Sequence, residues 1–167
     1  MSNAGYDELD LDGCIDNKKL LRYVSKSGLE LRYATDESAG LDLPYWDEKM
    51  PELVMLPGLR YKIPTGVFME IPKGYVGQID SRSSTSKLVI TLLCHTIDSD
   101  YRGEISLVFV NVGSGPVVLK SGEFYAQILI VPVERVRPQM VDSVQDLTET
   151  VRADGGFGST TIKKEGM

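Results

Sequence analysis

The sequence is poor in the residues that build metal and disulfide sites. It holds one histidine and two cysteines among 167 residues, and Cys14 and Cys94 form no CxxC pair. This scarcity argues against a disulfide framework and against a zinc site, and it fits a reducing cytosol. No apolar run approaches the ~20 residues of a membrane span. The first residues also lack the basic segment and apolar run of a secretory signal, so a cytoplasmic protein is expected.

Positive charge is in short supply as well. The chain has 18 Lys and Arg against 24 Asp and Glu, a formal net charge of −6. Nonspecific binding to nucleic acid or to an acidic membrane surface is therefore not expected. An anionic ligand would need a local cationic site or a metal ion. The length and the 42% share of hydrophobic residues suit one domain with a sizeable core.

A convincing long amphipathic helix is also missing. Residues alternate with period two at 67–71 and at 105–110, which predicts strands with one face in a core. Nearly unbroken apolar runs at 88–93 and 128–131 predict strands buried on both faces. Turn signals such as Pro57-Gly58 and Ser121-Gly122 recur between these runs. This spacing of short strands and turns is typical of an all-β sandwich or barrel.

The pattern divides the chain into one domain with two flanking segments. Residues 1–18 are polar and acidic, which predicts a flexible N-terminal extension. Residues 19–150 carry the strand pattern, with a looser connection from residue 138 onward. Residues 151–167 are expected to form a C-terminal arm, because no apolar run follows there to anchor them in a core.

The arm has the composition of a nucleotide-binding segment. Its stretch 152–160 reads RADGGFGST and combines glycines with an aromatic ring, two hydroxyls and a guanidinium. The ring of Phe157 can stack on a base. Glycine amides, the hydroxyls of Ser159 and Thr160, and the guanidinium of Arg152 can bind phosphates. We therefore expect a mobile arm that closes over a nucleoside triphosphate.

Two polar loops interrupt the strand pattern. The loop at 98–104 begins with Asp98, whose carboxylate could orient and deprotonate a water molecule. A solvated β-turn with Arg102 paired to Glu104 explains the same residues, and on local sequence alone it is the better interpretation. The loop at 81–86 places Arg82 among five hydroxyl residues, which suits a phosphate site. An ordinary polar loop is the alternative there.

Two shorter segments carry weaker signals. At 39–43, small residues that allow close backbone approach precede Asp42, although a turn at a strand edge explains them equally well. In the segment 122–127, Gln127 enters an apolar run, so a hydrogen-bond partner within the protein is expected for its side chain. His95 lacks the partners of a catalytic triad or a metal site, and we interpret it as structural or pocket-lining.

Taken in order, five of these stretches resemble the ordered motifs of trimeric dUTP diphosphatases (dUTPases). They are AGLDL at 39–43, SRSS at 81–84, TIDSDYRGE at 96–104, SGEFYAQ at 121–127 and RADGGFGST at 152–160. The third and fifth are the most specific, and the resemblance spans most of the chain. It implies a jelly-roll or distorted β-barrel protomer and a homotrimer. Each active site would lie at a subunit interface and draw motifs from more than one chain.

The resemblance implies hydrolysis of dUTP to dUMP and pyrophosphate. By motif position, Asp98 would activate the water that attacks the α-phosphorus. Tyr101 would pack under the deoxyribose and exclude a 2′-hydroxyl, Phe157 would stack on uracil, and Asp42 would support the polar network. The other substrate-binding residues implied are Arg82, Ser83, Ser84, Thr96, Ile97, Gln127, Arg152, Gly158, Ser159 and Thr160.

Mg²⁺ is the cofactor that the resemblance implies. A Mg²⁺ ion held mainly by the three phosphates would neutralise their charge without a dedicated set of protein ligands, so no residue is expected to bind the metal directly. Closure of the arm would exclude water and align the phosphates, and opening would release the products.

The chain departs from the family pattern at several positions. His95 stands where a glycine is frequent, in the hairpin whose backbone reads uracil in that family. Phe124 stands where an arginine is usual, and Ala153 replaces a frequent glycine. The altered hairpin leaves hydrolysis of dCTP open as an alternative. A nucleotide-sensing regulatory protein on the same fold is a second alternative, and both phages and bacteria are conceivable sources.

The sister family, dCTP deaminase, resembles the chain less well. It shares the fold, the Arg-Ser-Ser loop and an Ile-Asp turn. Deamination, however, requires a glutamate as proton shuttle on the following strand. The aligned residue here is Val108, which cannot transfer a proton. The sequence therefore favours hydrolysis over deamination.

Overall fold

The computed structural model describes residues 20–150 and residue 153. Their regular structure is all β, with eleven strands and two short 3-10 turns. This confirms the predicted fold class. The chain divides into two compact units, Met1–Glu134 and Arg135–Met167. All eleven strands belong to the first unit.

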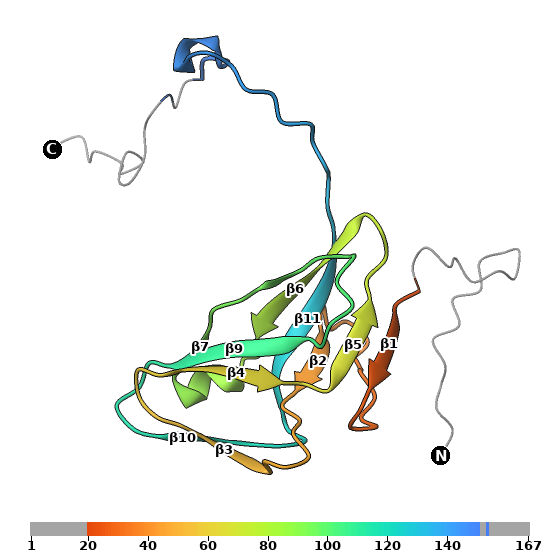
Figure 1. Ribbon diagram of the computed structural model, residues 1–167, viewed down its shortest axis with the longest axis vertical. Helices are drawn as coiled ribbons and strands as arrows, with labels where there is room; N and C mark the ends of the chain where they lie inside the picture. Colours follow the sequence, from red (N-terminus) through yellow and green to blue (C-terminus); the bar gives the residue numbers. More distant parts are fainter. Residues whose placement is uncertain (1–19, 151–152, 154–167) are drawn as a thin grey trace, which may run out of the picture. The chain divides into compact units, whose positions relative to one another are not determined.

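A four-stranded antiparallel sheet forms the centre of the first unit, in the order β2-β11-β6-β8 (Figure 1). Strand β11 (Phe124–Pro132) lies between β2 (Leu41–Pro44) and β6 (Tyr75–Ser81), and β8 (Thr96–Ile97) pairs with the other edge of β6. Because β11 is paired on both sides, Gln127 lies between Asp42 and Asp80 in one cross-strand row.

A three-stranded sheet, β4-β9-β7, packs into the same core. It consists of β4 (Arg60–Pro64), β9 (Ser106–Asn111) and β7 (Ile90–Leu92). Two antiparallel pairs complete the unit (Figure 1). Strand β1 (Arg22–Ser25) pairs with β5 (Val67–Glu70), and β3 (Glu52–Met55) pairs with β10 (Val117–Lys120).

The predicted period-two strands are confirmed. In β5, Val67 and Met69 are buried while Phe68 and Glu70 are only partly buried. In β9, Leu107, Phe109 and Asn111 are buried on the core face. One buried face on each strand provides the apolar area that holds the two sheets together.

The run at 88–93 was predicted as one strand buried on both faces, and that prediction is wrong. A 3-10 turn, η1 (Thr85–Leu88), occupies its start, and Val89 follows in the left-handed region with φ of 55°. Only Ile90 to Leu92 form a strand, and Thr91 and Leu93 on its outer face are exposed. The apolar composition of this run gave no sign of the turn. The turn requires Val89 to adopt a left-handed backbone conformation, which is unfavourable for a β-branched residue.

The second unit holds no strand among its described residues. Its one regular element is the 3-10 turn η2 (Val144–Asp146). Ser143 and Asp146 form a capping box, in which the Asp146 carboxylate accepts from the Ser143 amide and the Ser143 side chain accepts from the Asp146 backbone N–H. Among the described residues, no helix is long and apolar enough to span a membrane.

Candidate active site

Four residues from β2, β11 and the loop after β6 form a polar group that we call the Arg82 cluster: Asp42, Arg82, Phe124 and Gln127. The Arg82 Nε lies 2.9 Å from Asp42 Oδ1, and Arg82 Nη1 donates to the carbonyl of Phe124 at 3.0 Å. The Asp42 side chain is only 9% exposed and the Arg82 side chain 28%. The Nη2 amino group of Arg82 makes no hydrogen bond to a described residue, so it is free to bind a ligand.

Phe124 stands where the resemblance implied an arginine, and its ring contributes to the cluster. The Arg82 guanidinium carbon lies 6.0 Å from the ring centroid. The ring and the carbonyl of the same residue therefore both contact Arg82, and both favour a fixed guanidinium. Phe124 thus helps to orient the Arg82 guanidinium.

Gln127 differs from expectation. The sequence predicted a hydrogen-bond partner within the protein, but its side-chain amide makes no hydrogen bond within residues 20–150. It is partly buried beside Gly40, where an added Cβ would lie 2.8 Å from Gln127 Oε1. Gly40 therefore makes room for the Gln127 side chain, whereas segment 39–43 was expected to allow the close approach of two backbones. The Gln127 amide is left available to a ligand.

The hydroxyl loop that follows Arg82 is fixed at one end and open at the other. Thr85 is buried, and its hydroxyl donates to the Tyr125 carbonyl at 2.7 Å. Ser83 and Ser84 are exposed, and their hydroxyls make no hydrogen bond among the described residues. The loop therefore presents two free hydroxyls from a fixed base, an arrangement that can bind phosphate oxygens.

A second group of site residues lines a separate pocket, which we call the Asp98 pocket. Asp98 and Tyr101 are both exposed there, and the Asp98 carboxylate makes no ion pair or hydrogen bond with any described residue. The pocket is lined by Lys62, Cys94, Thr96, Ile97, Asp98, Tyr101, Glu104, Ser106 and Val108. A carboxylate that faces an open pocket without a partner can accept a proton from a bound water molecule.

The turn that carries Asp98 is held by Arg102. The Tyr101 amide donates to the Asp98 carbonyl at 3.1 Å, which closes a β-turn. Arg102 Nη1 then donates to the carbonyls of Ser99 at 2.7 Å and Tyr101 at 2.8 Å. The expected pairing of Arg102 with Glu104 is wrong, because the Glu104 carboxylate accepts from the Gly66 amide at 2.8 Å.

Tyr101 has a fixed orientation within this turn. Its hydroxyl donates to the Glu104 carbonyl at 3.1 Å. Its ring covers Gly103 so closely that an added Cβ would clash with the hydroxyl oxygen. Any side chain at 103 would displace the ring, so the glycine allows the ring to lie here as an apolar wall of the pocket.

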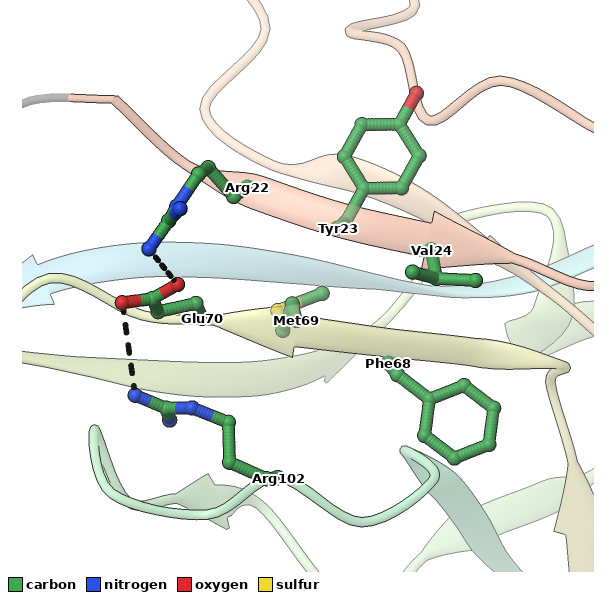
Figure 2. Close-up of a pocket in the computed structure, with 7 residues that line it drawn as sticks. All are labelled: Arg22, Tyr23, Val24, Phe68, Met69, Glu70 and Arg102. Carbon is green, nitrogen blue, oxygen red and sulfur yellow. Dashed lines mark ion pairs between the residues drawn. The ribbon is translucent and has the colours of Figure 1, made fainter.

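Arg102 also links this turn to the strand pair β1-β5, as Figure 2 shows. Its Nη2 lies 3.9 Å from Glu70 Oε1, and the other oxygen of Glu70 contacts Arg22 of β1 at 2.5 Å. A shallow pocket beside these residues also includes Phe68 and Met69. The two guanidinium groups and the single carboxylate leave one excess positive charge here, on exposed side chains where ion pairs are weak.

Within this single chain, the two groups of site residues lie apart. Strand β8 pairs with β6 at Gly77 and Gln78, whereas Arg82 follows Ser81 at the other end of β6. Gly77 and Ser81 are four residues apart, roughly 13 Å along a strand. No residue of the Arg82 cluster lines the Asp98 pocket. The expected arm residues Arg152, Phe157, Gly158, Ser159 and Thr160 lie outside the described residues.

Lys62 is a site residue that sequence reasoning missed. It pairs with Val108 across β4 and β9, lines the Asp98 pocket and makes no ion pair or hydrogen bond within the described residues. Only the register of β4 against β9 brings it to this pocket. The local sequence offered one signal for Lys62. It precedes Ile63, which is fully buried, and neighbouring residues of a strand face opposite sides, so Lys62 faces outward.

Buried tyrosines support the strand that carries the Arg82 cluster. The Tyr125 hydroxyl accepts from the Lys120 amide at 2.8 Å and donates to Glu123 Oε2 at 2.9 Å. Burial raises the pKa of Tyr125 to about 12, and the contact with Glu123 adds to the rise while the Lys120 amide opposes it. Burial, followed by the charge of Asp47, also raises the pKa of Tyr45.

Comparison with known proteins identifies one family. The protein-family model for dUTPase matches residues 29–161. The deoxyuridine 5′-triphosphate nucleotidohydrolase of Anaplasma marginale (strain St. Maries) is 47% identical over 146 residues, which cover 85% of this chain and 96% of that protein. The protein of the same description from Rhizobium johnstonii is 40% identical over 147 residues, covering 86% and 92%.

Solved structures agree on the fold. The dUTPase of Staphylococcus bacteriophage 80alpha with dUPNHPP matches with a TM-score of 0.74. That match covers 86% of this chain and 99% of the phage chain at 24% sequence identity. The dUTPase of phage phi11 of S. aureus matches with a TM-score of 0.67 at 21% identity, over 77% of this chain and 99% of that one.

Proposed function

The chain belongs to the dUTPase family and is a dUTP nucleotidohydrolase, and we propose that it forms dUMP and pyrophosphate by attack of water on the α-phosphorus. The observation that supports this reaction best is the Asp98 turn. It places an unpaired carboxylate beside the fixed ring of Tyr101 in an open pocket. Membership of the dUTPase family indicates dUTP as the substrate. In the turn, Asp98 would serve as the general base and the Tyr101 ring would contact the sugar.

The chemical step uses Asp98 as a general base. A water molecule bound to its carboxylate forms a bond to the α-phosphorus, and the bond from that phosphorus to the oxygen bridging the β-phosphorus breaks. The proton of the water passes to Asp98, and pyrophosphate leaves with the bond's electron pair. Positioned general bases contribute about 10²–10⁴-fold to such rates.

Sugar recognition falls to Tyr101. The ring is held flat by its hydroxyl contact with Glu104 and by its packing on Gly103. A deoxyribose can lie on this apolar face, whereas a 2′-hydroxyl would be pressed against it without a hydrogen-bond partner. An unpaired buried hydroxyl costs about 1–3 kcal/mol, which disfavours UTP.

Phosphate recognition falls to the Arg82 cluster and the hydroxyl loop after it. Arg82 keeps one amino group free while Asp42 and Phe124 hold the rest of the guanidinium. Ser83, Ser84 and Gln127 add neutral donors beside it. Arg152, Ser159 and Thr160 of the arm would bind the terminal phosphates.

Mg²⁺ is the cofactor we propose, bound through the substrate. Among the described residues, no three His, Cys, Asp or Glu side chains come together as a metal site. The donors that are present fit a metal ligated mainly by phosphate oxygens, with protein groups binding the remaining phosphate oxygens. When bound, Mg²⁺ would neutralise phosphate charge near Asp98.

We further propose a homotrimer in which the Asp98 pocket of one protomer meets the Arg82 cluster of another. The separation of the two groups within one protomer supports this arrangement, because a triphosphate must reach both. We expect the protein to act in the cytosol of a bacterium or of a phage-infected cell.

The decisive experiment is pyrophosphate release from dUTP, dCTP, dTTP and UTP with Mg²⁺ in ¹⁸O-labelled water. We expect release from dUTP alone, with the label in dUMP, since attack on the α-phosphorus places the water oxygen there. Label in pyrophosphate would overturn the proposed site of attack. Release from dCTP would overturn the base assignment. No release from any nucleotide would favour a regulatory nucleotide-binding protein.

A further inference from the structure

One wall of the Asp98 pocket has no part in the chemical step. Strand β9 contributes Ser106 and Val108 to that wall, and β4 contributes Lys62. Because Lys62 pairs with Val108 across the two antiparallel strands, both side chains lie on the same face of the sheet. Lys62 therefore reaches the pocket from the middle of a regular strand, whose register fixes the position of its backbone.

Lys62 is the one cationic side chain among the described residues that line this pocket. Its ammonium group makes no ion pair or hydrogen bond with any residue that the structure describes. The other charged groups of the lining are the carboxylates of Asp98 and Glu104. Lys62 thus adds to an otherwise acidic lining a hydrogen-bond donor that no described protein group occupies.

The order of residues along this wall indicates which part of the substrate meets Lys62. Tyr101, the proposed sugar platform, donates to the Glu104 carbonyl just before β9 begins. Lys62 faces Val108, which lies further along the same strand. The phosphates are assigned to the Arg82 cluster, no member of which lines this pocket. With the sugar on Tyr101 and the phosphates at the cluster, the base is the part that extends along β9 toward Lys62.

The edge of a pyrimidine opposite the sugar is where uracil and cytosine differ. Position 4 lies across the ring from the nitrogen that bears the sugar, and it carries a carbonyl oxygen in uracil and an amino group in cytosine. The oxygen accepts a hydrogen bond, whereas the amino group donates. A lysine ammonium has three donors and no acceptor, so it binds the carbonyl and cannot pair with the amino group. The carboxylates of Asp98 and Glu104 have the opposite preference.

We propose that Lys62 is a specificity-determining residue of the site. Its ammonium group donates to the 4-carbonyl of uracil and so selects dUTP over dCTP. The inference rests on the proposed function, because it names how one side chain of that site distinguishes two pyrimidines. Lys62 lies outside all five motifs that carried the family resemblance, so this selection does not follow from them.

The test compares Lys62→Met with Lys62→Arg. Methionine keeps an unbranched stem without the charge or the donor, and Lys62 is exposed without a described partner, so the fold should be unchanged. We expect kcat/KM for dUTP to fall about 10-fold, as for the loss of a hydrogen bond from a charged group. The value for dCTP should stay the same or rise. Arginine keeps a cationic donor and should hold the preference for dUTP to within about threefold of the wild-type value.

Arg60→Met is the matched control. Arg60 lies two residues before Lys62 on the same strand, pairs with Val110 and is exposed without a described partner. It does not line the Asp98 pocket. Its replacement removes the same charge from the same strand, so an effect of net charge alone would appear equally in both variants. We expect the base preference of Arg60→Met to equal that of the wild type.

Nucleosides without phosphate separate recognition of the base from attraction of the phosphates. Titration of the wild-type and Lys62→Met proteins with 2′-deoxyuridine and with 2′-deoxycytidine, followed by NMR, measures the nucleoside alone. We expect methionine to weaken the binding of deoxyuridine about 10-fold. The binding of deoxycytidine should be unchanged or improved, because the ammonium group makes no bond to its amino group.

Two results would overturn the proposal. One is an unchanged ratio of kcat/KM for dUTP and dCTP in Lys62→Met. The other is an unchanged affinity of that variant for deoxyuridine together with weaker binding of dUTP, which would assign Lys62 to the phosphates. If the wild-type protein hydrolyses no nucleotide, the proposed function fails while the nucleoside titrations still test Lys62. The two failures are therefore distinguishable.

Discussion

The Arg82 cluster and the Asp98 pocket solve the problem of holding a charged side chain in opposite ways. In the cluster, Asp42 and Arg82 are largely buried and hydrogen-bonded to a central sheet before any ligand arrives. In the pocket, Asp98 is exposed on a turn, and its carboxylate has no partner among the described residues. One region is organised by long-range strand pairing and the other by a local turn.

The difference suits the roles that we propose for the two regions. A phosphate-binding guanidinium gains from being fixed, because less side-chain entropy is lost when the ligand binds. A general base must keep its oxygens free for water, and a buried ion pair would occupy them. Hydrogen bonds from Arg102 hold the turn around Asp98, while the Asp98 carboxylate itself has no partner among the described residues. Substrate, arm and a neighbouring protomer would then exclude bulk water.

The largest effect is expected from Asp98→Asn. Asparagine keeps the size of the side chain but cannot take the proton, so kcat for dUTP should fall about 10²–10⁴-fold. The thermal unfolding midpoint should stay within a degree or two, because the carboxylate has no described partner to lose. A variant that loses stability as well would show that the pocket is organised like the cluster.

Mixing two inactive variants tests whether the regions meet across protomers. Asp98→Asn and Arg82→Ala should each be nearly inactive alone. Unfolded and refolded together, they should form hybrid trimers in which some sites combine an intact Asp98 with an intact Arg82. Activity should return to a fraction of the wild-type rate. No recovery despite hybrid formation would mean that both residues of a site come from one protomer.

Asp42→Ala should damage stability and binding together. It leaves the partly buried guanidinium of Arg82 without its carboxylate, which we expect to cost about 1–3 kcal/mol of unfolding free energy. KM for dUTP should rise about 10-fold, because Arg82 is then free to move. Asp42→Asn is the matched control, since its amide oxygen still accepts from Arg82 Nε and should preserve most of the stability. Denaturant unfolding and steady-state kinetics measure both effects.

Arg102→Ala should have a smaller effect, confined to activity. The turn loses two hydrogen bonds from Nη1, so Asp98 and Tyr101 are held less firmly and kcat should fall about 10-fold. Stability should change by less than about 1 kcal/mol because the side chain is exposed. Arg22→Ala is the control, since it removes the outer ion pair to Glu70 and leaves the turn untouched. Equal losses in both variants would contradict the role given to the turn.

The same contrast explains which parts of the site the sequence could predict. Asp98 and Tyr101 share one turn, so local pattern sufficed to place them together. Asp42, Arg82 and Gln127 come from three segments, and only their ordered resemblance to a family linked them. Lys62 was missed because its position depends on the register of β4 and β9. The prediction of one buried strand at 88–93 was wrong because an apolar composition does not distinguish a buried strand from a turn with a left-handed valine.

The smallest effect is expected from Tyr125, which supports β11 beneath the Arg82 cluster. Its folded-state pKa of about 12 lies above the ordinary tyrosine value near 10. Below pH 10 both states hold the proton and the contribution to stability is complete. Between pH 10 and 12 the unfolded chain releases the proton while the folded protein retains it, so stability falls as pH rises.

Tyr125→Phe should therefore flatten the fall in unfolding free energy between pH 10 and 12, as measured by denaturant titrations at fixed pH. At pH 8 it should cost about 1 kcal/mol, because the Lys120 amide and Glu123 lose their partner. Some slope should remain, since the pKa of Tyr45 is raised in the same direction. An unchanged slope would show that Tyr125 is solvated in the folded protein, and β11 would then be less firmly packed than the Arg82 cluster requires.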